Sequence, residues 1–207
     1  MHRCVSSTPD SSSSLTLQKN NETSSTFSTL EMLSTVCETV STRPAYTMSG
    51  EGLNDYKGFL KILDWKIRNN PPLPTSSNSP ESIMLAELFQ LATLVYLDRA
   101  SGNLLDQEAR TQERISKAFT ILSQLPTCER QFPLFLLGCE ARTDEQRVTI
   151  FDLISNTEKN TSSRSFMYTK RLLQAIWVQD DLATQQIDYT NKLSAMISCC
   201  STLPTFV

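Results

Sequence analysis

The stretch AELFQLATLVYLDRASG, residues 86–102, decides the fold class of this chain of 207 residues. Drawn as a helix, it directs apolar side chains to nearly every side, and a helix that is apolar all round belongs in the middle of a bundle. Just upstream, Ser79, Pro80 and Glu81 combine an N-cap residue, a proline at the first helical position and an acid in the first turn. Gly102 predicts a left-handed C-cap at the other end. The sequence therefore predicts a central helix that ends near residue 100.

Six further segments carry apolar residues at spacings of three and four, as amphipathic helices do. They start at Gly52, Asp106, Phe132, Thr143, Ser163 and Ala183, and the last of them reaches about residue 197. In the first, the apolar stripe is formed by Tyr56, Phe59, Leu60, Leu63 and Ile67. In the helix that Thr143 opens, with Gln146 at capping-box spacing, the apolar face is expected at Val148, Ile154 and either Ile150 or Phe151. No alternating run long enough for a strand interrupts them, so we predict an all-α fold, an irregular multi-helix array with a disordered N-terminal tail.

Serine and threonine dominate the beginning of the chain, where they occupy 21 of the first 50 positions. Such a segment buries too little apolar area to offset the entropy lost on ordering. We therefore expect a disordered tail over residues 1–26, a short helix and linker over residues 27–51, and a helical domain over residues 52–207.

The charge balance argues against direct binding of nucleic acid. The formal net charge is −3, whereas domains that hold phosphates carry a basic excess on one face. The densest basic group consists of Lys57, Lys61, Lys66 and Arg68, and it is interleaved with Asp55 and Asp64. We interpret it as the solvated face of a helix. There is also no apolar region after the first Met and no apolar run near the roughly 20 residues of a membrane span, so we expect no membrane contact.

Residues that carry chemistry are scarce. None of the six cysteines forms a pair at the short spacing of zinc sites, and we expect reduced thiols, with Cys128 and Cys139 in the core. His2 is the sole histidine, which removes Ser-His and Cys-His nucleophile pairs. Glycine-rich phosphate loops are missing too. The sequence therefore predicts no catalytic, cofactor-binding or metal-ligating residue.

Three weaker candidates have ordinary structural interpretations. The acids Glu140, Asp180 and Asp181 are expected at a helix end or in a loop rather than converging as an acid–base pair. Trp65 and Trp177 lie on apolar stripes, where core packing is more frequent than lining a ligand pocket. For Arg142 and Arg171, ion pairing is favoured over clamping an anion.

Three stretches together resemble a known family. They are residues 86–102, FPLFLLGCEARTDEQR at residues 132–147 and KRLLQAIWVQDDL at residues 170–182. Their order and spacing resemble the C-terminal region of fungal zinc-cluster transcription factors, the fungal-specific transcription factor domain, over about residues 50–200. Phe132 stands where the family often has tryptophan. The spacing of the cysteines rules out the binuclear zinc cluster of complete members, and the chain is shorter than a typical member.

The resemblance implies a nuclear regulatory domain that works through protein contacts, with the transcription machinery, a related factor or a second copy, and without direct binding of nucleic acid. Many relatives govern nutrient use or secondary-metabolite gene clusters, and a small-molecule effector stays open. The shared motifs imply no functional residue, because Leu134, Phe135 and Leu137 fit core positions, Gly138 a close helix approach and Thr143 a cap. Alternatives are a small-molecule-binding module, with a cavity beside Tyr96 and Trp177, and a truncated remnant without activity. We do not expect an enzyme, because histidine pairs, glycine loops and metal ligands are missing from the sequence.

Overall fold

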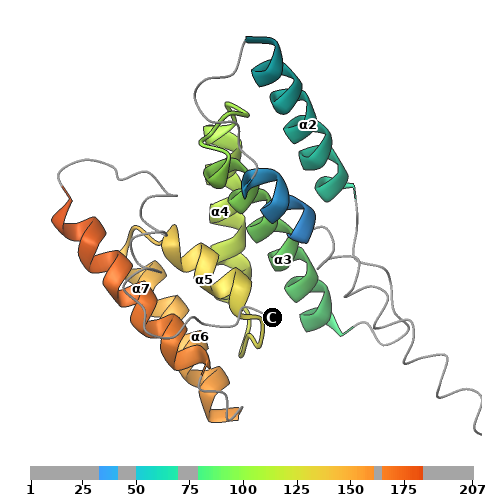
Figure 1. Cartoon of the computed structure of the whole chain (residues 1–207). Helices are drawn as coiled ribbons and strands as arrows, with labels where there is room; N and C mark the ends of the chain where they lie inside the picture. Colours follow the sequence, from blue (N-terminus) through green and yellow to red (C-terminus); the bar gives the residue numbers. More distant parts are fainter. Residues whose placement is uncertain (1–32, 42–49, 70–78, 161–164, 184–207) are drawn as a thin grey trace, which may run out of the picture.

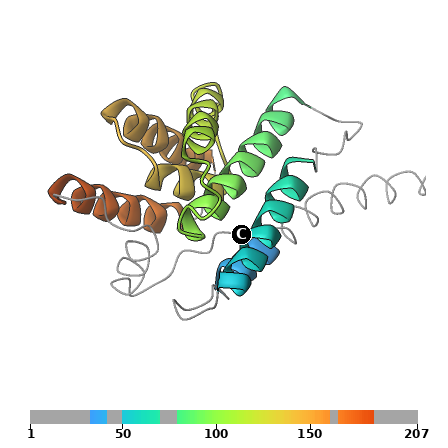
Figure 2. The ribbon, with the colours of Figure 1, turned by 90° about the horizontal axis from the view of Figure 1, so that it is seen from above.

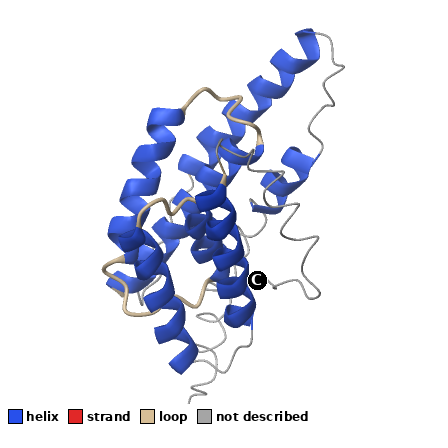
Figure 3. Ribbon diagram, turned by 90° about the vertical axis from the view of Figure 1, so that its left-hand side faces the viewer, coloured by secondary structure: helices blue, strands red, loops and turns tan. Residues whose placement is uncertain are grey.

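The computed structural model describes residues 33–41, 50–69, 79–160 and 165–183, and within these ranges every regular element is a helix (Figures 1 and 3). A short helix at residues 33–41 precedes six others. These are α2 (Gly50–Arg68), α3 (Pro80–Ala100), α4 (Glu108–Leu122), α5 (Gln131–Cys139), α6 (Asp144–Asn160) and α7 (Ser165–Leu182). The all-α prediction is confirmed. The predicted tail at residues 1–26 and the predicted helix over residues 183–197 lie outside the described residues, apart from residue 183.

Helix α3 is the centre of the array, as its apolar sequence predicts. It packs against α2 on one side and against α4 and α5 on the other (Figure 2). Its two sides contribute side chains to two different hydrophobic clusters. Leu88, Leu91 and Val95 join the larger cluster with α4, α5, α6 and α7. Leu94 and Leu97 join a smaller cluster with α2 and the helix at residues 33–41.

Both predicted caps of α3 form. The Ser79 Oγ accepts a hydrogen bond from the backbone N–H of Ser82 at 3.2 Å. At the other end Gly102 has a φ of 73°, and its N–H donates to the Arg99 carbonyl while the Asn103 N–H donates to the Asp98 carbonyl, both at 3.0 Å. These two bonds make a Schellman motif, which satisfies carbonyls that the helix end would otherwise leave open.

The start of α4 differs from the prediction. The helix begins at Glu108 rather than at Asp106, because Asp106 has a φ of 54° and a left-handed residue cannot continue a right-handed helix. The capping box of α6 does form as predicted. The Thr143 Oγ1 accepts from the Gln146 N–H, and the Gln146 Oε1 accepts from the Thr143 N–H, both at 3.3 Å.

Helices α5 and α7 approach closely at Gly138. A Cβ added at this glycine would lie 2.7 Å from both methyl carbons of Leu173. In addition, the Trp177 Nε1 donates to the Gly138 carbonyl at 2.8 Å. The core positions expected from the motif are also confirmed, since Leu134, Phe135 and Leu137 are buried.

Three expected core positions are wrong. Phe59 and Trp65 of α2 are 47% and 58% exposed, and Val148 of α6 is 57% exposed. In α2 the buried side is set by Leu60, Leu63 and Ile67 together with Asp64, which turns Phe59 and Trp65 outward. In α6 the buried side runs through Ile150 and Ile154, as expected, and through Leu153 in place of Val148. None of the helices in the described ranges is long and apolar enough to cross a membrane.

Candidate functional site

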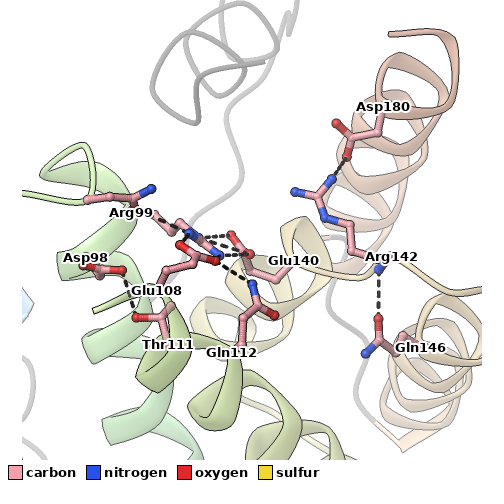
Figure 4. Close-up of polar contacts among 10 residues, drawn as sticks. Asp98, Arg99, Glu108, Thr111, Gln112, Glu140, Arg142, Gln146 and Asp180 are labelled. Atoms are coloured by element: carbon pink, nitrogen blue, oxygen red, sulfur yellow. Dashed lines mark hydrogen bonds and ion pairs between the residues drawn. The ribbon is translucent and has the colours of Figure 1, made fainter. Parts of the chain in front are cut away.

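The ends of α3 and α5 and the start of α4 meet in a group of charged side chains, Arg99, Glu108 and Glu140, which we call the ion cluster (Figure 4). The Arg99 Nη1 donates to Glu108 Oε2 at 2.6 Å and its Nη2 to Glu108 Oε1 at 3.0 Å. On its other edge, Arg99 Nε lies 3.3 Å from both Glu140 oxygens. One guanidinium therefore bridges carboxylates from two further segments of the chain.

Burial makes the ion cluster electrostatically strong. The side chains of Arg99 and Glu140 are 8% and 3% exposed, whereas that of Glu108 is 53% exposed. Burial alone would lower the pKa of Arg99, but the hydrogen bonds to Glu108 and the charge of Glu140 outweigh it and raise the pKa. The bond from Arg99 holds the pKa of Glu108 below its usual value. The pKa shifts of Arg99 and Glu108 both favour the charged forms, as pairing with an opposite charge does.

A second polar contact lies beside the ion cluster, between α3 and α4. The Thr111 Oγ1 donates to Asp98 Oδ2 at 2.8 Å, and both residues are fully buried. Asp98 Oδ1 has no hydrogen-bond partner among the described residues. Burial raises the pKa of Asp98, against the lowering effects of Thr111 and Arg99.

Helix α2 is held to α4 by a buried ion pair. Arg114 Nη2 donates to Asp64 Oδ1 at 2.8 Å, and the two residues are 6% and 1% exposed. Arg68, one turn further along α2, binds the other oxygen of Asp64 at 2.8 Å. Asp64 was expected on a solvated face, and this expectation is wrong because Arg114 draws it inward.

Helix α7 forms two ion pairs that are less buried than the Asp64–Arg114 pair, one with Arg147 of α6 and one with Arg142, which precedes α6. Arg147 binds both oxygens of Asp181 at 2.8 and 2.7 Å, and the hydrogen bonds lower the pKa of Asp181 and raise that of Arg147. Arg142 Nη1 lies 3.5 Å from Asp180 Oδ2, which agrees with ion pairing rather than anion clamping. Arg171 is exposed on α7.

These polar contacts hold the helices in position, and they do not bring the candidate acids together for catalysis. Glu140 pairs with Arg99 while Asp180 pairs with Arg142, so the structure does not bring these two acids together (Figure 4). Burial raises the pKa of the Cys128 thiol to about 11, which keeps it protonated and unreactive. Within the described ranges, no group of three or more His, Cys, Asp or Glu residues could hold a metal ion.

The aromatic residues that could have bordered a ligand cavity are in contact with other side chains. The Trp177 ring lies 4.8 Å from the Phe151 ring, centroid to centroid, and 5.5 Å from the Arg147 guanidinium carbon. Tyr96 packs edge-on against Phe132 at 6.2 Å, and burial raises the pKa of its hydroxyl to about 12. Trp177 is therefore a core residue, as predicted, whereas Trp65 is not.

Sequence reasoning missed the ion cluster although two of its residues, Arg99 and Glu140, lie inside the quoted motifs. The available signal was the presence of Arg99 and Glu140 within apolar segments, because charged residues are seldom buried unless they are paired. Their separation of 41 residues gave no hint of which partner each would take. The exposed apolar side of α2 was missed as well.

Together, the fold and the ion cluster define an all-α domain in which buried ion pairs hold the helices in position. Comparison with known proteins agrees with this description. Residues 53–201 match the fungal specific transcription factor domain, so the chain belongs to this family. It is similar to the transcription factor iacI of Pestalotiopsis fici, with 45% identity over 182 residues, which cover 87% of this chain and 46% of that protein. The chain thus spans about half the length of this curated relative, and no solved structure matches.

The family assignment bears on function at a coarse level. Both the family and the relative are transcription factors, which supports a transcription-regulatory role and implies that this role is nuclear.

Proposed function

We propose that this domain regulates transcription in the nucleus through contacts with other proteins, without gripping DNA itself and without enzymatic activity. The observation that carries the proposal is the meeting of two of the family's motifs in the buried ion cluster, joined by Arg99 and Glu140. A domain whose buried ion pairs fix helix positions is suited to presenting a rigid surface to partners.

The placement of the basic residues supports the part of the proposal that concerns DNA. Arg99, Arg114 and Arg147 are each held by carboxylates of the same chain. Binding to phosphates requires many free lysines and arginines gathered on one face, since each neutralised phosphate adds to the affinity. On α2 the exposed Lys61 and Lys66 share the helix with an exposed acid, Asp55. The net charge of −3 adds to this argument.

The proposal extends to the genes that are controlled. Relatives of this family govern nutrient use or secondary-metabolite clusters, and by resemblance we propose that this protein acts on a metabolic or secondary-metabolite gene cluster. Deleting the gene and profiling transcripts is the direct measurement. We expect coordinated changes in one group of neighbouring genes, reversed by returning the gene.

A tethering experiment tests the regulatory role of the chain itself. The full chain is fused to a heterologous DNA-binding domain whose operator precedes a reporter gene. We expect reporter output to change several-fold relative to the DNA-binding domain alone. A folded fusion that leaves the reporter unchanged would contradict the proposal and favour a remnant or a small-molecule-binding module.

Direct DNA contact is tested by a selection from random duplexes at physiological salt, followed by gel shift. We expect the full chain to enrich no sequence. Enrichment of one motif bound with nanomolar affinity, the range of specific DNA-binding proteins, would overturn the proposed mode of action.

A further inference from the structure

One side of α2 is apolar and uncovered by any described residue. Phe59, Ile62 and Trp65 are 47%, 54% and 58% exposed, and α2 is the outermost helix on its side of the array (Figures 1 and 2). We call these three residues, together with Gly58, the α2 outer face. Three large apolar side chains exposed within two turns mark an interaction site more often than scattered single ones do.

The orientation of α2 is fixed from its other side. Leu60, Leu63 and Ile67 are at most 4% exposed, and Asp64 is paired to Arg114. The Tyr56 hydroxyl also donates to the Thr39 carbonyl at 3.1 Å. A rotation that buried Trp65 would expose these residues and break the buried ion pair, so the outer face is a stable feature of the domain.

The spacing of the outer face suits another helix. Gly58, Ile62 and Trp65 follow one another at intervals of four and three, the repeat of a helix–helix seam. A Cβ at Gly58 would meet nothing within 4 Å, so this position is a gap on the surface that lets a second backbone approach. Phe59 lies beside the seam and would flank such a partner.

The charges around the outer face favour an acidic partner. Lys61 and Lys66 are exposed beside it, and neither forms an ion pair within the described part of the chain. Asp64 is turned inward and shared by Arg68 and Arg114. Of the α2 side chains that the structure describes, Asp55 alone is an exposed acid. The outer face is therefore locally basic on a chain that is acidic overall.

We propose that the α2 outer face binds an amphipathic acidic helix of a partner protein, with apolar residues over Ile62 and Trp65 and carboxylates at Lys61 and Lys66. This rests on the proposed function, because it names the surface through which the domain makes its regulatory contacts. Hydrophobic anchors supply affinity in such helix-in-groove contacts, and complementary charge supplies selectivity and association rate.

Other occupants fit less well. Two copies joined through this face would bring together surfaces that both carry an excess of lysine. Outside the described ranges the acids of this chain are Asp10, Glu22, Glu31 and Asp188. They are too far apart in sequence to line one face of a helix.

The test is binding of a labelled synthetic peptide to the full chain, measured by fluorescence anisotropy. The peptide has about 18 residues, or about five helical turns, with leucines on one side and glutamates elsewhere. Its control carries lysine in place of every glutamate. We expect the acidic peptide to bind and the basic one not to bind. Equal binding of both, or none at millimolar concentration, overturns the proposal.

Variants locate the site. W65A should raise the Kd of the acidic peptide about tenfold or more, as loss of an aromatic anchor does. V178A removes an apolar side chain that is also 58% exposed, on α7, and should leave the Kd unchanged. K61E with K66E should weaken binding and reduce its salt dependence. Equal effects of W65A and V178A would contradict the assignment, and circular dichroism verifies that every variant is folded.

Three further measurements address the rival occupants, and each supports or overturns the proposal. Light scattering should give a monomer, whereas a dimer lost in W65A would assign the face to a second copy. Vesicles of phosphatidylcholine and phosphatidylserine should not bind, whereas binding lost in W65A would assign it to a lipid surface. Acrylamide should quench the tryptophan fluorescence of the unmodified chain more strongly than that of the W65F variant, because Trp65 is exposed. Equal quenching of the two proteins would mean that another part of this chain covers the α2 outer face.

The tethered reporter separates this inference from the proposed function. If the unmodified fusion is active and the W65A fusion loses activity, both stand. If both fusions are equally active, the α2 outer face is not the regulatory surface although the domain is a regulator. If the unmodified fusion is inactive while the acidic peptide binds at Trp65, the regulatory role fails and the binding site remains.

Discussion

The ion cluster and the α2 outer face are opposites in what they place inside and outside the domain. The ion cluster buries Arg99 and Glu140, which are charged, within apolar segments of the sequence. The α2 outer face exposes Phe59, Ile62 and Trp65, which are apolar, within the most lysine-rich helix. The contrast shows that partners, more than residue type, decide where a side chain lies. Arg99 can be buried because two carboxylates receive it, and Trp65 is exposed because α2 already has a complete apolar face.

The two regions also differ in what a substitution should do. A buried charge that loses its partner keeps its desolvation cost, so the ion cluster should be sensitive in stability measurements. An exposed apolar side chain buries little area in the free protein, so the α2 outer face should be insensitive.

The largest effect is expected for R99M, which leaves Glu140 buried without its arginine. Breaking a buried pair by removing one partner costs about 3–5 kcal/mol of unfolding free energy, and urea denaturation measures the loss. The double variant R99M with E140L should recover much of it. R110M, at an exposed position of α4, serves as the control and should change stability by less than about 0.5 kcal/mol.

The next largest effects are expected for two glycine substitutions, which should change the free energy of unfolding in opposite directions. G138A forces a Cβ to within 2.7 Å of Leu173, and such overpacking costs about 1–3 kcal/mol. G58A adds a Cβ in open space and should stabilise α2 by about 0.5–1 kcal/mol, because alanine is the better helix former. A G138A variant with unchanged stability would contradict the close packing assigned to α5 and α7, and a loss of stability in G58A would contradict the open space at Gly58.

A pH series distinguishes the acids near the ion cluster. The lowered pKa of Glu108 means that it stabilises the fold above its usual pKa of 4.5, and that this contribution is lost as pH falls through the lowered pKa. E108Q should therefore cost about 0.5–1 kcal/mol at pH 7, a value reduced for its half-exposed side chain. The cost should vanish in strong acid.

Asp98 should show the opposite trend. Its raised pKa means that its contribution to stability is present at low pH and is lost as pH rises through the raised pKa. D98N should therefore gain stability relative to the unmodified protein between about pH 4 and pH 7, as followed by thermal unfolding. A D98N variant that becomes relatively less stable over this range would show that Asp98 is stabilised by Arg99 more than it is penalised by burial.

The smallest effect is expected at the α2 outer face. W65A should change the unfolding free energy by no more than about 0.5 kcal/mol, because the ring is mostly in water. V148A, at a similarly exposed position of α6, is the matched control. A large loss in W65A alone would mean that the ring is buried by part of the chain outside the described ranges.

Features that depend on neighbours in sequence could be predicted. The caps at Ser79, Gly102 and Thr143 use bonds that span a few residues, so short patterns reveal them. The burial of α3 could be predicted because its apolar residues leave no polar side to present to water. The candidate site could not be predicted in the same way, since Arg99 and Glu140 are brought together only by the packing of α3 against α5.

By itself, the sequence determined that this protein is a helical array with a central α3 and with its helix ends capped where short motifs require it. Only the tertiary structure decided that Asp64 faces inward and Trp65 outward, and that Arg99 serves two carboxylates. The physical reason is that helix periodicity constrains which residues share a face. Which of two adjacent faces is buried depends on the partners that distant helices supply.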